Sequence, residues 1–446
     1  MDRLPVELVR AIAAEVVTLT DRLSLRRVCR RWRAIVDDVV FTSFEISGRQ
    51  IRRLVEAILA RPRIGASIRA LSVQKWAVLR SGALRSGPLS PETKALAKGS
   101  CSSTEIGRRW CHELEQGNQE AWFALLLVLV PNLTNLSSNY SWPTDWTTMV
   151  VSRAAFKELP TLQALNSLDL TIPMHVKYVS GLHTIPIYQV LPFLHLPSIQ
   201  TVRVERVADS KSFELSYVYG AGDHPALHPC LRTSPLESLI VNPSHSLEGE
   251  GAADLIDSCA NLKHFIFQNQ NVIDRSLCRI FRPLAFRAPL LGQKHSLEVL
   301  HFNNEGDGSS GLGGIVEEDD PAPSDRWFGS FAEFKRLRDL RVRVHNLLNL
   351  HPLDRHELVA LKDTLPSSLK SLHITDCDEV HCPVLVSNFL DLLAHPSRIP
   401  NLEEVFVYSA IAGGPVWGVL REQFAPVQEM FGRAEIKFEL SLGRGS

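Results

Sequence analysis

Residues Leu297 to Phe302 read LEVLHF, and this pattern returns along most of the chain. Its first, fourth and sixth positions are leucine or another aliphatic or aromatic residue in all copies but the one at Leu133, which has serine at the sixth. The clearest copies begin at Leu236, Leu262, Leu297, Leu337, Leu369 and Leu402, and weaker copies begin at Ile68, Leu133, Leu165 and Ile199. From Leu133 onward the copies start 26 to 40 residues apart, which indicates a repeat protein with a loose period.

Each copy is predicted to be a β-strand followed by a returning helix. The fourth and sixth positions, such as Leu300 and Phe302, lie two residues apart and therefore share one face of a strand. Helix-like segments occupy residues 121–130, 187–196, 252–258, 353–365, 384–394 and 416–431, and prolines 131, 160, 197, 366 and 400 end several helix-like segments before the next strand. One strand and one helix make one coil of a solenoid.

The recurring strand resembles the leucine-rich repeat over roughly residues 64–442, with residues 435–440 as a closing strand. The resemblance implies an α/β horseshoe with a parallel sheet inside and helices outside. The period exceeds the roughly 20–29 residues that are usual for this repeat, and the asparagine that normally follows the strand is mostly missing. We therefore expect an irregular solenoid. The alternative is a doubly wound sheet, whose strands would be more uniformly apolar on both faces.

Two stretches do not fit the coils. Residues 81–103 are rich in Ser, Gly and Pro, and residues 303–325 are glycine-rich and then acidic, so we expect mobile inserted loops near 81–117 and 303–326. The second stretch has the G-x-G-x-x-G spacing at Gly306, Gly308 and Gly311. Four acidic residues follow it where a phosphate site needs a helix start, so nucleotide binding is not expected.

The N-terminal segment differs in kind from the repeats. Residues 4–38 read LPVELVRAIAAEVVTLTDRLSLRRVCRRWRAIVDD. Leu8, Ile12 and Val16 follow Pro5 at four-residue steps and predict one amphipathic helix, and the apolar residues between 25 and 36 predict a second. Two short helices cannot bury all these apolar side chains between them. The remaining apolar side chains must therefore pack on the solenoid or on another protein.

This segment resembles the F-box, whose pattern includes leucine-proline, glutamate-leucine, valine-cysteine and tryptophan. The adaptor contacts that the resemblance implies are Leu4, Pro5, Leu8, Ile12, Val28, Cys29 and Trp32. Ala13 departs from the pattern, which usually has a larger aliphatic residue there, and the distance from Leu4 to Trp32 looks one residue longer than usual. We therefore divide the chain into a helical F-box module, residues 1–45, and a solenoid, residues 46–446.

An F-box followed by leucine-rich repeats implies a substrate receptor of a Skp-cullin-F-box ubiquitin ligase. In the family the F-box binds the Skp-family adaptor, and through it a cullin, while the repeats select the target protein. The alternative is a repeat scaffold that assembles proteins without directing their ubiquitination. We find no catalytic motif and expect neither an enzyme nor a cofactor; Cys377, His381 and Cys382 miss the spacing of a closed zinc site.

The composition supports a soluble protein of the cytoplasm or nucleus. The 48 Lys and Arg against 49 Asp and Glu give a net charge of -1, which does not favour nucleic-acid binding. The longest apolar run, residues 121–130, is about half the length that crosses a membrane. Eight scattered cysteines and a charged N-terminus predict reduced thiols and no secretion signal.

The target protein is expected to bind the concave face of the sheet. Side chains at the fifth position of each copy, and just after the sixth, point away from the helices. The candidates are Ile240, Ile266, His301, Arg341, Arg343, His373, Phe406 and Tyr408. Aromatic and arginine side chains are common interface anchors, and the arginines predict an acidic or phosphorylated ligand.

Overall fold

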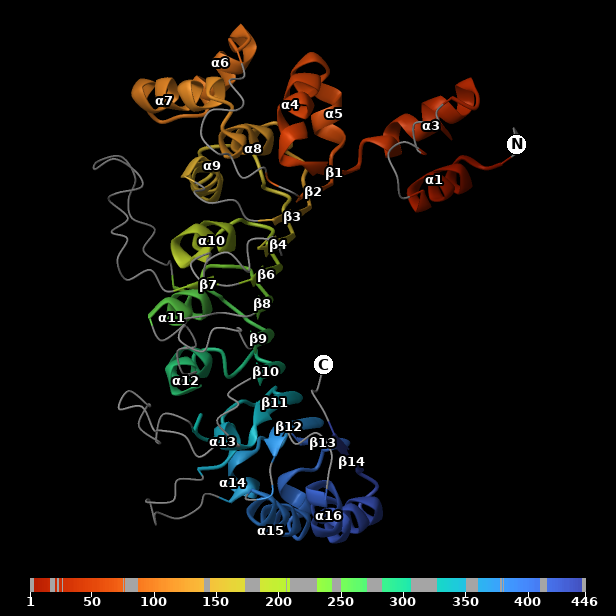
Figure 1. Ribbon diagram of the computed structural model, residues 1–446, viewed down its shortest axis with the longest axis vertical. Helices are drawn as coiled ribbons and strands as arrows, with labels where there is room; N and C mark the ends of the chain where they lie inside the picture. Colours follow the sequence, from red (N-terminus) through yellow and green to blue (C-terminus); the bar gives the residue numbers. More distant parts are fainter. Residues whose placement is uncertain are drawn as a thin grey trace. The chain divides into compact units, whose positions relative to one another are not determined.

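The computed structural model describes residues 4–16, 21, 24–25, 27–74, 76, 87–139, 145–172, 185–205, 207–208, 231–242, 250–270, 283–305, 327–349, 360–377, 379, 381–409 and 415–442. The chain divides into two compact units, which are described separately. One comprises mainly Met1–His183 and Tyr188–Val202, and the other mainly Pro229–Ser446. Figure 1 shows the helices and strands of both.

The described strands form a 12-stranded sheet whose order follows the sequence. The first unit contains β1 (Ser43–Ser47), β2 (Ala70–Gln74), β3 (Asn135–Asn139) and β4 (Ser167–Thr171), and β6 (Thr201–Glu205) follows. The second contains β8 (Ser238–Asn242), β9 (His264–Gln270), β10 (Val299–Glu305), β11 (Asp339–Arg343), β12 (Ser371–Cys377), β13 (Glu404–Ser409) and β14 (Lys437–Leu442). A small parallel pair is formed by β5 (Ile185–Pro186) and β7 (Val207–Ala208).

The strand order confirms the predicted solenoid. Every predicted copy forms a strand parallel to its neighbours in the described pairings, and residues 437–442 form the closing strand. A doubly wound sheet would reverse its strand order at a switch point, so that alternative is wrong. β1 was not predicted.

The repeat pattern forms the core because its apolar positions stack from coil to coil. Leu297, Leu300 and Phe302 are each 0% exposed, and Leu300 lies between Phe265 and Leu340 in the register of the sheet. Equivalent residues of adjacent coils therefore contact one another, and each strand contributes apolar area to a continuous core.

The first unit has α1 (Val6–Glu15), α3 (Arg30–Val40), α4 (Ile51–Ala60), α5 (Pro62–Ser67), α6 (Pro91–Gly99), α7 (Thr104–Glu115), α8 (Gln119–Val128), α9 (Asp145–Ala155) and α10, which begins at Ile187 and ends at Leu194. The second has α11 (Glu250–Asp257), α12 (Pro283–Leu291), α13 (Val344–Leu347), α14 (Leu361–Thr364), α15 (Cys382–Leu393) and α16 (Pro415–Arg433). In Figure 1, α8 to α10 lie on one side of the strands of the first unit, and α11 and α12 lie on one side of those of the second, whereas α1 and α3 lie apart from the sheet. Five predicted helical segments are confirmed; the sixth is described only from residue 360, where α14 forms.

The loop predicted near 81–117 is wrong for the part that the structure describes, because α6 and α7 lie there. Ser90 Oγ accepts a hydrogen bond from the Thr93 amide at 3.2 Å and caps α6, and Ser103 caps α7 in the same way. Trp110 is 0% exposed and anchors α7. The serines that suggested a loop are therefore N-caps of two helices. Of the second predicted loop, residues 303–305 belong to β10, and residues 306–326, with the glycine motif, lie outside the described residues.

Candidate functional site

The N-terminal module is held together by a small core between α1 and α3. Val9, Ala13, Trp32, Val36 and Val40 are buried in it. Ala13 is 0% exposed, so the small side chain that departs from the F-box pattern lies at the centre of this packing.

Two polar contacts involve the start of α3. The Arg31 guanidinium donates a hydrogen bond from Nη2 to the Leu4 carbonyl oxygen at 2.7 Å, and the Trp32 amide donates one to Cys29 Sγ at 3.4 Å. The start of α1 is thereby fixed to α3, and Cys29 caps the start of α3.

Three large aliphatic side chains of this module are exposed. Leu8 is 51% exposed, Ile12 44% and Val28 55%. Leu8 and Ile12 lie one turn apart on α1, on a stripe about 100° around the helix from the buried Val9 and Ala13. Such apolar surface on so small a module is typical of a protein-binding site.

The remaining predicted adaptor residues differ in exposure. Pro5 is exposed, while Leu4 and Cys29 are half-buried against the module core. Trp32 is 5% exposed and packs inside the module, so it stabilises the helices that present Leu8, Ile12 and Val28. Contact of each residue with an adaptor stays a prediction.

The predicted substrate residues come together on the second unit. Strand register places Ile240, Ile266, His301, Arg341, His373 and Phe406 side by side in one row across β8 to β13, and Glu439 of β14 continues it. All six predicted members of the row are half-buried. The row lies on the sheet face opposite the buried ladder.

Aromatic rings and cations stack at one end of this row. The rings of His373 and Phe406 are 4.5 Å apart at 14°, and Tyr408 lies 6.3 Å from Phe406 at 11°. The Arg341 guanidinium lies 5.7 Å from the Tyr408 ring, and Lys437 Nζ lies 4.5 Å from the Phe406 ring. We call these five residues the ring cluster.

Acidic side chains lie beside the ring cluster. His301 Nε2 lies 3.0 Å from Asp339 Oδ2, and Ser371 Oγ donates a hydrogen bond to Glu404 at 2.8 Å. Burial tends to raise the pKa of Asp339, but the hydrogen bond and charge of His301 hold it below its ordinary value. Burial lowers the pKa of His373 below its ordinary value, which disfavours the charged imidazolium.

Arg343 lies outside the ring cluster although it follows Arg341 by two residues. It is 8% exposed, and its guanidinium donates a hydrogen bond to the Asp376 carboxylate. Asp376 has φ of 57° at a register irregularity between Ile374 and Cys377. The bulge positions the carboxylate that neutralises Arg343, so the predicted pair of ligand-binding arginines is reduced to Arg341.

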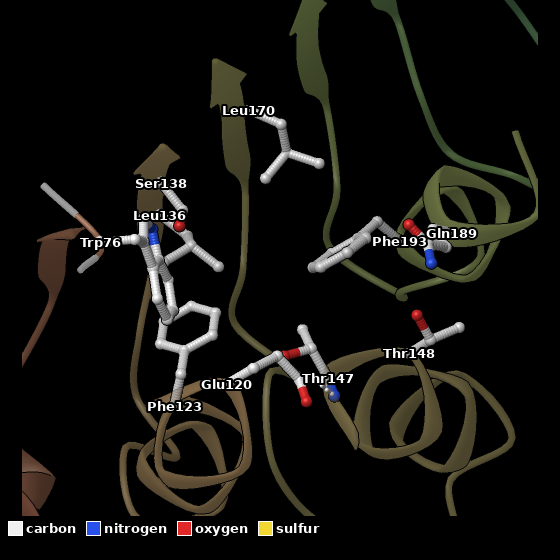
Figure 2. A pocket seen from close by; sticks show the side chains of 10 residues that line it. All are labelled: Trp76, Glu120, Phe123, Leu136, Ser138, Thr147, Thr148, Leu170, Gln189 and Phe193. Carbon is white, nitrogen blue, oxygen red and sulfur yellow. Dashed lines mark hydrogen bonds between the residues drawn. The ribbon is translucent and has the colours of Figure 1, made fainter. Parts of the chain in front are cut away.

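A cavity of about 20 Å³ lies between the sheet and the helices of the first unit (Figure 2). It is lined by Trp76, Glu120, Phe123, Leu136, Ser138, Thr147, Thr148, Leu170, Gln189 and Phe193. Ser138 is the sixth residue of the weak copy LTNLSS, where most copies have a larger apolar side chain. The short side chain leaves space, and the size and polar lining suit one water molecule.

Glu120 is a buried acid at the edge of this cavity. Its two carboxyl oxygens accept hydrogen bonds from the backbone amides of Thr147 at 2.5 Å and Trp146 at 3.4 Å, and so cap α9. Burial nevertheless raises the pKa of Glu120 to about 8, against the effect of the Thr147 and Trp146 hydrogen bonds. Sequence reasoning missed Glu120; the signal was one acidic residue at the start of an otherwise apolar helix.

The described part of the chain contains neither a metal-binding group nor a membrane-spanning helix. There, no three His, Cys, Asp or Glu side chains are grouped closely enough to hold a metal ion. Cys377 and Cys382 are buried and not joined in a disulfide. No helix in the described ranges has the length and apolar character needed to cross a membrane.

Two family models match the chain. The F-box-like model matches residues 1–44, and the leucine-rich repeat domain model matches residues 94–412. No curated protein matches it. Because the second match extends over more than half of the sequence, the chain belongs to the leucine-rich repeat family, with an F-box-like domain at its N-terminus.

Proposed function

We propose that the protein is a substrate receptor of a Skp-cullin-F-box ubiquitin ligase, acting in the cytoplasm or nucleus. The F-box-like module docks on the Skp-family adaptor, the adaptor joins it to a cullin, and the leucine-rich repeats bind the protein to be ubiquitinated. The chain itself contributes no catalytic group. The observation that supports this proposal is the exposed aliphatic surface of Leu8, Ile12 and Val28.

These side chains suit a docking role because exposing them has a cost that a partner removes. Fully burying a leucine or isoleucine side chain stabilises a structure by about 1.5–3 kcal/mol. The module keeps Val9, Ala13 and Trp32 for its own core, so Leu8 and Ile12 are not needed to fold it. Their substitution should therefore separate docking from folding.

The first prediction is that Leu8→Asp together with Ile12→Asp abolishes adaptor binding. Two carboxylates in an apolar interface lose the contacts and resist desolvation, so recovery of adaptor and cullin should fall at least tenfold. The measurement is affinity purification of the tagged full chain from cells, with mass spectrometry of the copurifying proteins.

Val419→Asp is the matched control, since Val419 is 45% exposed on α16 of the other unit. It should retain adaptor and cullin. Thermal melting should show both variants folded like the wild type. Equal adaptor recovery from the double variant would refute this docking surface. If the wild type also recovers no adaptor, the result would favour the alternative, a scaffold that does not enter a ligase.

The target protein is proposed to bind the ring cluster and the adjoining apolar residues Ile240 and Ile266. The row and the ring cluster offer half-buried aromatic rings, a cation over Tyr408 and an aliphatic end, which together fit a mixed apolar and polar peptide segment. Asp339, Glu404 and Glu439 lie among the cations, so a purely acidic ligand is no longer favoured.

The second prediction is that Arg341→Ala with Phe406→Ala removes at least one copurifying protein while the adaptor stays bound. Loss of two central interface anchors typically costs more than 2 kcal/mol, or roughly thirtyfold in affinity. Arg398→Ala, which removes a 62% exposed cation outside the sheet, is the control. An unchanged partner list would place target recognition elsewhere. Arg343 is avoided because removing it would leave Asp376 without its cation.

A further inference from the structure

The last strand of the sheet, β14, has a neighbour on one side only among the described strands. It pairs with β13 from Lys437↔Glu404 to Leu442↔Ser409. An open edge strand exposes unpaired backbone groups that can bind another strand. Repeat proteins usually cover such an end with a capping element.

The core ladder is only partly covered at this end. In register, Phe438 and Leu440 continue Val405 and Val407, which are each 0% exposed. Phe438 packs on Phe431, 5.3 Å away at 8°, yet Phe438 and Leu440 are only half-buried. The apolar surface that an additional coil would cover is therefore still accessible at β14.

The backbone of β14 directs alternate residues to this open edge. The Lys437 amide donates to the Glu403 carbonyl oxygen at 2.9 Å, so the backbone groups of Lys437 and Glu439 face β13. Those of Phe438 and Leu440 consequently face away from it. The Ile436 amide is already bonded to the Phe431 carbonyl, which leaves only the Ile436 carbonyl available there.

We propose that β14 pairs antiparallel with β14 of a second copy of this chain, around a two-fold axis at Phe438. Phe438 then lies opposite its own copy, and the two exchange both backbone hydrogen bonds. Lys437 lies opposite Glu439 of the partner subunit, and Glu439 opposite the partner's Lys437. These charged residues form the closely spaced class of antiparallel pairs, with Cα atoms about 4.5 Å apart.

Charge selects this register over its neighbours. The side chain of Lys437 is 60% exposed and that of Glu439 is 49% exposed, with Nζ and Oε2 3.7 Å apart within the strand. The neighbouring antiparallel registers place Lys437 opposite Lys437 of the partner subunit, or Glu439 opposite the partner's Glu439. Like charges directly opposite are destabilising. The segment from Lys437 to Glu439 is thus self-complementary, as an isologous dimer requires.

The test is the oligomeric state of the intact chain by analytical ultracentrifugation over a range of concentrations. The wild type should show a concentration-dependent dimer. Lys437→Glu alone and Glu439→Lys alone each place two like-charge pairs across the axis and should raise the dimer dissociation constant about tenfold or more. An equal mixture of the two single variants should dimerise again, because every cross-strand pair in the mixed dimer is then of opposite charge.

The mixture separates pairing between chains from the contact of Lys437 with Glu439 inside one strand, which mixing cannot restore. The double variant Lys437→Glu/Glu439→Lys should also dimerise like the wild type. A wild type that is monomeric at every concentration, or single variants that dimerise as the wild type does, would overturn the proposal. Adaptor binding is proposed for the other unit and should be unchanged in all variants, so the oligomeric state and adaptor binding can fail separately; target binding is not a readout here, because Lys437 belongs to the ring cluster.

Discussion

Replacing Phe286 by alanine should lower the free energy of unfolding of the second unit by about 3–5 kcal/mol. Phe286 lies on α12 and is 0% exposed. Its ring centroid lies 5.9 Å from that of Phe265, 5.2 Å from Phe267 and 5.7 Å from Phe302. The substitution removes one buried ring from contacts with two adjacent strands and leaves a cavity that their side chains cannot fill.

Leu284→Ala is the matched control, because Leu284 lies on the same helix but is 44% exposed. Its effect should stay within about 0.5 kcal/mol. The measurement is urea unfolding followed by circular dichroism, with hydrogen exchange of the β9 and β10 segments to locate the effect. An effect of Phe286→Ala as small as that of Leu284→Ala would show that α12 does not pack on these strands.

Raising the pH from 5 to 7.5 should weaken the first unit through Glu120. Its pKa is about 4.5 ordinarily and about 8 in the folded protein, since burial disfavours the carboxylate. In this range the folded state therefore binds a proton that the unfolded chain has lost. The contribution of Glu120 to stability is complete below about pH 4.5, declines by about 1.4 kcal/mol per pH unit, and is lost above about pH 8.

The measurement is the free energy of urea unfolding at several pH values for the wild type and Glu120→Gln, which is neutral at every pH. The wild type should lose stability with rising pH faster than the variant, and the difference between the two slopes reports Glu120 alone. Glu105→Gln, which removes an exposed carboxyl on α7, should keep the wild-type slope. Parallel curves for wild type and Glu120→Gln would show that Glu120 is ionised in the folded state.

The row of predicted target-binding residues could be predicted from the sequence, whereas the acidic residues near it could not. The row containing Arg341, His373 and Phe406 follows from a period of two residues, because alternate side chains of a strand must face the same side. Its acidic end, Glu439, and the neighbouring Asp339 and Glu404 were not foreseen. Asp376 approaches Arg343 only through a local bulge, and such an irregularity has no simple signature in the repeat pattern.

The F-box-like helices show the same division. The spacing of Leu8 and Ile12 correctly predicts a helix, but the same helix also contains the apolar pair Val9 and Ala13. Periodicity cannot tell which of two apolar stripes is buried. Packing against α3 decided it, burying Val9 and Ala13 and leaving Leu8 and Ile12 exposed.

The sequence by itself determined the coils, because burying the first, fourth and sixth residues of each copy is a local requirement that every coil repeats. LTNLSS, with Ser138 at the sixth position, still forms a strand for this reason. Only the tertiary structure decided the cavity above Ser138, the capping of α9 by Glu120 and the partial exposure of Phe438. These depend on which residues from distant coils and helices lie beside each position, and the local spacing of apolar residues contains no information about those neighbours.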